Sequence, residues 1–180
     1  MRALAAAVAL GVLAACSNKP AKEEPPASTI MGLARITPKN DSTVRGVIVF
    51  TQKGDRVGVA GTFFELYPGP HSIYIHTVGN CNSPNAASAG PVWNVPGNTG
   101  PRRSGDLPQI NAGTEGRADL SVTLSGLSVN TGFPNDVIGH SVVIHAYVDA
   151  EPKPEFGVRT GWLACGVIRA VEGQSLKELL

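Results

Sequence analysis

The chain has three cysteines, whose chemistry depends on the compartment in which the protein folds. Cys16 ends residues 13–16, Leu-Ala-Ala-Cys, the pattern of a signal peptide that is cut before a cysteine whose thiol is then acylated. Met1 and Arg2 supply the short positive region. Residues 3–13 supply an apolar run that is too short to cross a bilayer. The sequence therefore predicts a signal peptide over residues 1–15 and a lipid-modified Cys16.

An ordinary secretory signal cut near Ala15, with Cys16 as a spare thiol, is the alternative. We favour the lipoprotein because the cysteine stands where the small-residue cleavage site should be. Acyl chains would then hold the protein on a membrane, since each methylene buried in the bilayer contributes about 0.8 kcal/mol to the free energy of membrane binding. Residues 16–28 carry the lipidated cysteine and a polar, proline-bearing flexible linker. The expected location is the cell envelope, at the periplasmic face of the outer membrane.

Export also decides the expected state of Cys81 and Cys165. With Cys16 assigned to lipid, these two remain as a pair in an oxidising compartment, where a disulfide is the default. Two buried free thiols are the alternative, and export argues against them. Closing a loop of about 85 residues stabilises a fold by roughly 4.5 kcal/mol in the chain-entropy treatment.

Strand and turn patterns follow from about residue 29 onward. Segments rich in β-formers and bounded by turn residues predict strands over 44–50, 57–63, 71–76, 119–124, 142–147 and 163–168. Residues 80–112 are rich in Gly, Pro, Asn and Ser and lack periodicity, which predicts a long loop. About eight short strands with long loops favour an all-β Greek-key sandwich or flattened barrel over residues 29–172. Residues 173–180 form a C-terminal tail.

Five segments, in order, resemble the copper/zinc superoxide dismutase family. They are residues 69–76 (GPHSIYIH), 79–91 (GNC, then SAGP), 104–107 (SGDL), 138–145 (IGHSVVIH) and 161–168 (GWLACGVI). The resemblance covers roughly residues 33–170 and implies an eight-stranded Greek-key barrel with a copper and a zinc site.

Only part of the family's copper site has a counterpart here. The resemblance places the first copper histidine at Tyr74, the second at His76, the bridging histidine at Val92 and the fourth at His145. Strand alternation puts Tyr74 and His76 on one face. Two imidazoles suit Cu(I), which accepts low coordination, better than Cu(II), which prefers four donors. His76 and His145 are therefore the candidate copper ligands, either as residual ligands or as inherited residues without a metal.

The family's zinc site and its anion-docking arginine are more completely lost. One zinc histidine has no counterpart, another falls at Arg103, and Asp106 alone stands at a ligand position. A zinc site needs four donors, so zinc is not expected here and Asp106 serves more simply to order its loop. Trp162 stands where the resemblance implies the arginine that docks superoxide, and Arg159 lies three residues too early. Asp149 matches an aspartate that steadies metal ligands in the family.

These departures predict an envelope lipoprotein of the dismutase family that lacks dismutase activity and serves as a structural or binding module. A copper-dependent dismutase with a remodelled site and a periplasmic copper-binding protein using His76 and His145 are the alternatives. No cofactor is expected, with copper possible at reduced affinity. The formal net charge is +1, which gives no reason to expect a nucleic-acid partner. The lipid links the chain to a membrane, and a homodimer is compatible with the sequence.

Overall fold

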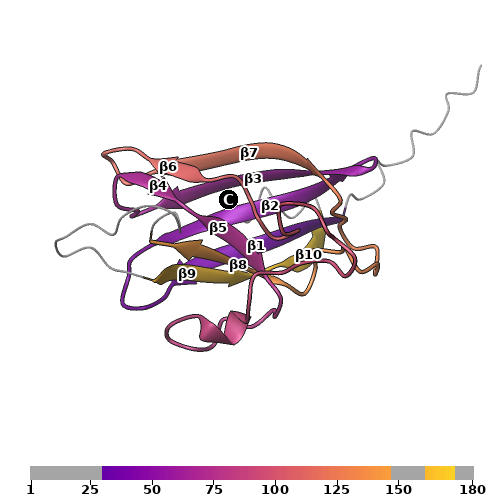
Figure 1. Ribbon diagram of the computed structural model, residues 1–180. Helices are drawn as coiled ribbons and strands as arrows, with labels where there is room; N and C mark the ends of the chain where they lie inside the picture. Colours follow the sequence, from indigo (N-terminus) through magenta and orange to yellow (C-terminus); the bar gives the residue numbers. More distant parts are fainter. Residues whose placement is uncertain (1–29, 147–160, 173–180) are drawn as a thin grey trace, which may run out of the picture.

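The computed structural model describes residues 30–146 and 161–172, which form antiparallel strands and one short 3-10 helix (Figure 1). The strands are β1 (Ile30–Pro38), β2 (Arg45–Lys53), β3 (Arg56–Phe64), β4 (Gly69–His71), β5 (Ile73–His76), β6 (Ile110–Ala112), β7 (Ala118–Ser125), β8 (Ser141–His145), β9 (Trp162–Val167) and β10 (Arg169–Glu172), and the helix is η1 (Ala87–Ala89). Cys16, Asp149, Arg159 and the expected signal peptide, linker and tail lie outside the described residues.

The strands form one curled sheet in the order β5-β8-β9-β1-β2-β3-β7, with β10 paired to β1. β4 and β6 make a separate two-stranded pair. Because chain neighbours β4 and β5 belong to different sheets, the chain crosses from one sheet to the other at Ser72. The prediction of an all-β flattened barrel is confirmed.

The hairpin of β2 and β3 shows how the sequence builds this sheet. Gly54 takes a left-handed backbone (φ 61°) in the turn, where the absence of a Cβ removes the steric cost. Ile48 and Phe50 alternate on β2, and Val57 and Val59 on β3, and all four are buried in the interior. This period-two pattern fixes the register, since a slip of one residue would turn the apolar face to solvent.

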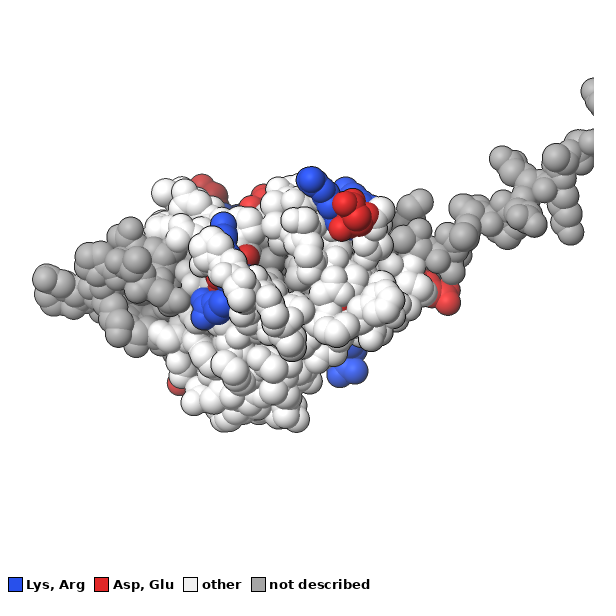
Figure 2. All heavy atoms as spheres, turned by 45° about the vertical axis from the view of Figure 1, so that its right-hand side comes forward, with Lys and Arg blue, Asp and Glu red and all other residues white. Residues whose placement is uncertain are grey.

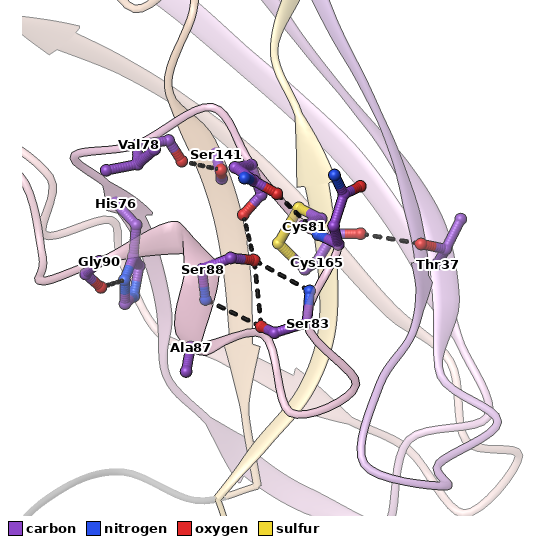
Figure 3. The surroundings of a disulfide bond; sticks show 12 residues. Thr37, His76, Val78, Cys81, Ser83, Ala87, Ser88, Gly90, Ser141 and Cys165 are labelled. Atoms are coloured by element: carbon purple, nitrogen blue, oxygen red, sulfur yellow. Dashed lines mark hydrogen bonds between the residues drawn. A yellow bond between two sulfur atoms is a disulfide. The ribbon is translucent and has the colours of Figure 1, made fainter.

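The long loop after β5 is attached to the sheet by the Cys81–Cys165 disulfide (Figure 3). The Cα atoms of the two cysteines are 5.7 Å apart, and Cys165 is fully buried in β9. Ser88 Oγ donates to the Asn80 carbonyl at 2.9 Å, and the Ser88 backbone N–H donates to Ser83 Oγ at 2.8 Å. The predicted disulfide is confirmed, and it fixes the loop that lies beside His76.

Charged residues make up 16% of the chain. On the face shown in Figure 2, a few basic and acidic groups, some of them next to one another, lie on a mostly uncharged surface. The described residues contain no helix with the length and apolar character needed to cross a bilayer.

Candidate metal centre

Strands β5 and β8 bring the two candidate copper histidines together. Tyr74 lies opposite Val143 in this antiparallel pair, so Tyr74, His76 and His145 share one face of the sheet. His76 and His145 stand at opposite ends of the paired stretch, yet their ring centroids approach to 5.9 Å. The two imidazoles converge, as the resemblance implies.

The backbone around His145 is fixed by two contacts. The His145 N–H donates to the Ser72 carbonyl at 2.9 Å, and His71 Nδ1 lies 3.1 Å from the His145 carbonyl oxygen. A register shift between Ile144 and His145 brings His145 opposite Trp162. Such a bulge re-aims side chains at the end of a strand. His71 is therefore a structural histidine, since its other ring nitrogen, Nε2, lies 2.8 Å from the Tyr67 carbonyl oxygen.

His76 is fully buried, and its two ring nitrogens have different surroundings. Nδ1 donates to the Gly90 carbonyl at 2.7 Å (Figure 3), which places the proton of the neutral ring on Nδ1. Nε2 is buried and has no hydrogen-bond partner among the described residues. Burial lowers the pKa of His76, and the positive charge of Arg103 lowers it further, while the Gly90 carbonyl opposes both. The neutral ring thus keeps a lone pair on Nε2.

Aromatic rings surround the two imidazoles. The Trp162 ring stacks on His145 with centroids 5.5 Å apart and meets the edge of His76 at 4.8 Å. Tyr74 contacts the His145 ring edge-on at 4.8 Å. Trp162 therefore packs against both histidines, at the position to which the resemblance assigns a docking cation. Its indole adds apolar surface there and no positive charge.

The remaining positions supply no further metal donor. Val92 pairs with His76 in an isolated backbone bridge and brings an aliphatic side chain to the position of the bridging ligand. Asp106 is already engaged, because Oδ1 accepts from Arg103 Nε at 2.9 Å and Oδ2 accepts from the Arg103 backbone N–H at 2.8 Å. Among residues 30–146 and 161–172, no group of three or more His, Cys, Asp or Glu side chains could hold a metal ion.

The residues present therefore do not fit a zinc ion, and they offer copper two imidazoles at most. Zinc requires four donors, and its one candidate carboxylate is paired with a guanidinium. A two-imidazole contact suits Cu(I) and does not satisfy the tetragonal preference of Cu(II). No redox step through a metal follows from this arrangement.

Comparison with known proteins agrees with the segments that carry the resemblance. A sequence model of the copper/zinc superoxide dismutase (SODC) family matches residues 44–168. The chain is also 33% identical, over 138 residues, to a protein named superoxide dismutase [Cu-Zn] 2 from Brassica juncea, a match that covers 69% of this chain and 89% of that one. The chain belongs to the copper/zinc superoxide dismutase family.

Sequence reasoning did not predict the contacts of Arg103. Arg103 pairs with Asp106 and lies over the Tyr74 ring, with Cζ 5.2 Å from the centroid. Opposite charges three residues apart in one loop are a signal that could have indicated this pair. Trp93 stacks on His140 at 4.2 Å, and His140 Nδ1 donates to the Thr77 carbonyl at 2.9 Å, so both are packing residues.

Proposed function

We propose that this member of the dismutase family does not dismutate superoxide and serves in the cell envelope as a lipid-anchored structural or binding module. The observation that carries the proposal is the convergence of only two imidazoles, His76 and His145, in the place of a two-metal centre. Dismutation requires one site that alternates between two copper oxidation states. Val92 removes the bridging imidazole, and Trp162 replaces the arginine that docks the anion.

A second candidate function is copper binding without turnover. This function is favoured by His76 Nε2, which is buried and has no hydrogen-bond partner among the described residues. A buried acceptor without a partner lowers the stability of the fold, and binding of a metal ion to its lone pair would offset that cost. His145 faces the same space at 5.9 Å. In this reading the protein buffers Cu(I) in the periplasm.

Metal analysis and a dismutase assay on one preparation test both proposals. We expect a soluble form beginning at Ser28 to show no dismutase activity above that of free copper, even after loading with copper and zinc. Stoichiometric copper without turnover would support the second candidate. A chelator-sensitive rate near the diffusion limit of about 10⁸–10⁹ M⁻¹s⁻¹ would overturn the first and identify a remodelled dismutase.

The envelope location rests on the sequence around Cys16. An acylated cysteine followed by a polar linker would tether the barrel at the periplasmic face, which we propose is that of the outer membrane. The disulfide supports an oxidising compartment, since such bonds rarely persist in the cytosol.

A further inference from the structure

The loop between η1 and β6 lies directly on strand β5. The Trp93 N–H donates to the Ile75 carbonyl at 2.9 Å, the Ile75 N–H donates to the Gly105 carbonyl at 2.8 Å, and the Gly105 N–H donates to the Trp93 carbonyl at 2.9 Å. A Cβ on Gly105 would stand 2.3 Å from the Ile75 carbonyl oxygen, so only glycine permits this approach. Both ends of residues 93–105 are thus attached to one point of the sheet.

Side-chain amides organise the interior of this loop. Asn98 Nδ2 donates to Asn94 Oδ1 at 2.8 Å and to the Arg102 carbonyl at 3.0 Å. Asn98 Oδ1 accepts from the Gly100 N–H at 3.0 Å, and Asn94 Oδ1 accepts from the Ser104 N–H at 3.0 Å. These bonds give the loop a defined path and involve no histidine, cysteine or carboxylate side chain.

Arg103 adds a cation at the point where the loop returns to β5. Its Nε and Nη2 donate to Asp106 Oδ1 at 2.9 and 2.8 Å, and its backbone N–H donates to Oδ2 at 2.8 Å. The guanidinium also covers the Tyr74 ring, and Tyr74 forms a backbone bridge with Asp106. The Asp106 side chain is only 17% exposed, whereas that of Arg103 is 46% exposed. One cation therefore contacts both the loop carboxylate and the strand.

We propose that the Arg103 guanidinium is the built-in structural cation of this loop and takes the place that the family gives to zinc. A guanidinium is permanently charged, and two of its nitrogens donate to Asp106 Oδ1, so it pairs with this carboxylate without needing a metal supply. Zinc would have to displace it, and the described residues offer no group of three donors around Asp106. The loop is consequently ordered whether or not metal is present. The proposal concerns the loop alone and stands or falls separately from dismutase activity.

Hydrogen exchange at the Trp93 and Gly105 amides tests the proposal on the folded, disulfide-bonded protein. We expect exchange at both amides to be unchanged by EDTA or by added zinc. Arg103→Gln and Asp106→Asn should each speed it by about threefold to tenfold, the range of a partly exposed ion pair. Arg103→Lys keeps the positive charge but loses the planar guanidinium. Its exchange rate should therefore lie between that of the wild type and that of Arg103→Gln. Arg102→Gln is the matched control, because Arg102 forms no ion pair within the described part of the chain, and it should leave exchange unchanged.

Three results would overturn the proposal. Slower exchange on adding zinc, or faster exchange with EDTA, would show that a metal orders the loop. Wild-type exchange in both Arg103→Gln and Asp106→Asn would show that the pair does not order it. If Asn98→Ala opens the loop while those two variants do not, the amide network carries the order and the cation is incidental. A global stability measurement on each variant separates loop opening from unfolding of the barrel.

Discussion

His76 illustrates how a buried imidazole can keep its metal-binding form when most of its partners are replaced. The Gly90 carbonyl holds the proton on Nδ1, and burial favours the neutral ring. The same hydrogen bond that would orient a ligand thus remains. What has changed is the surroundings, where Tyr74, Val92 and Trp162 offer ring faces and methyl groups in place of nitrogen donors.

If the chain binds copper, as the second candidate function proposes, we predict that His145→Ala abolishes stoichiometric Cu(I) binding and leaves the fold nearly intact. One imidazole of the pair is removed, and a single ligand cannot hold the ion, whereas the barrel and the disulfide do not depend on it. Titration under anaerobic reduction measures the binding, and urea unfolding should show a loss of about 1 kcal/mol or less.

His140→Ala is the control for that experiment. His140 stacks on Trp93 outside the pair, so the variant should bind copper as the wild type does. Copper affinity that persists in His145→Ala, or tight stoichiometric zinc in the native chain, would show that the site has been misplaced.

The residue types that are absent from the site could be recognised from the sequence, but the new contacts of their replacements could not. Val92 has no donor in any conformation, so its effect follows from its identity. Arg103 has a long side chain with many reachable positions, and its pairing depends on the turn that brings residues 103 and 106 together. Only the three-dimensional path of the loop decides between a solvated arginine and a paired one.

Among the elements, the strands with clean alternation were predicted best. Residues 57–63 and 119–124 appear within β3 and β7, each of which is longer by one residue at both ends. The predicted strand over 71–76 is divided at Ser72, because His71 pairs with Ile110 of β6 and Ile73 with Ile144 of β8. The alternation of apolar and polar residues along a strand is the same whichever strand it pairs with, so the sequence could not predict this division.

Three strands, β1, β6 and β10, had no specific prediction, and for β1 and β6 the physical reason can be identified. In β1, residues 31–34 are all buried, so consecutive apolar positions remove the alternation that signals a strand. β6 has only three residues, which is shorter than any pattern that can be counted. It therefore remained part of the predicted loop over 80–112.

The loop between β7 and β8 depends on a single carboxylate, Asp136. Oδ1 accepts from the backbone N–H groups of Asn130 and Ile138 at 3.0 Å each, and Oδ2 accepts from those of Thr131 and Gly132 at 2.6 and 2.8 Å. Burial acts to raise the pKa of Asp136, but the four backbone donors outweigh it and lower the pKa below the ordinary value of 3.8.

We predict that Asp136→Asn lowers the free energy of unfolding by about 1–3 kcal/mol at neutral pH, since an amide nitrogen would face two N–H donors. Because the folded-state pKa is depressed, the stability from this carboxylate is present above the unfolded value of 3.8 and is lost as pH falls through the folded value. Urea unfolding at neutral and at acid pH measures the free energy of unfolding of the wild type and of Asp136→Asn.

The difference between wild type and Asp136→Asn should therefore shrink below pH 3.8. Asp55→Asn, in the exposed β2–β3 turn, is the matched control and should change stability little at either pH. A difference that is constant with pH would mean that the carboxylate charge contributes nothing.

Over the whole molecule, the formal net charge of only +1 gives no reason to expect an attraction between the barrel and a charged surface. The barrel begins at Ile30, and an extended chain of the length of residues 17–29 spans about 45 Å. Such a tether would let the barrel stand clear of a membrane. Association with the membrane would then depend on the acyl chains alone.

We therefore predict that Cys16→Ser, expressed in a bacterium with lipoprotein processing, moves the protein from the membrane fraction to the soluble periplasmic fraction. The reason is that burial of the acyl chains is the dominant favourable term, and a serine hydroxyl at that position offers no thiol for the modification. Fractionation with immunodetection measures the location, and mass spectrometry of the intact wild-type chain should show the added lipid mass. The Cys81–Cys165 disulfide should form in both proteins, which would confirm that each was exported and folded.

Wild-type protein found in the soluble fraction with an unmodified Cys16 would favour the ordinary secretory signal cut near Ala15. Membrane association that survives in Cys16→Ser, with the signal peptide removed, would show that the barrel itself contacts the membrane.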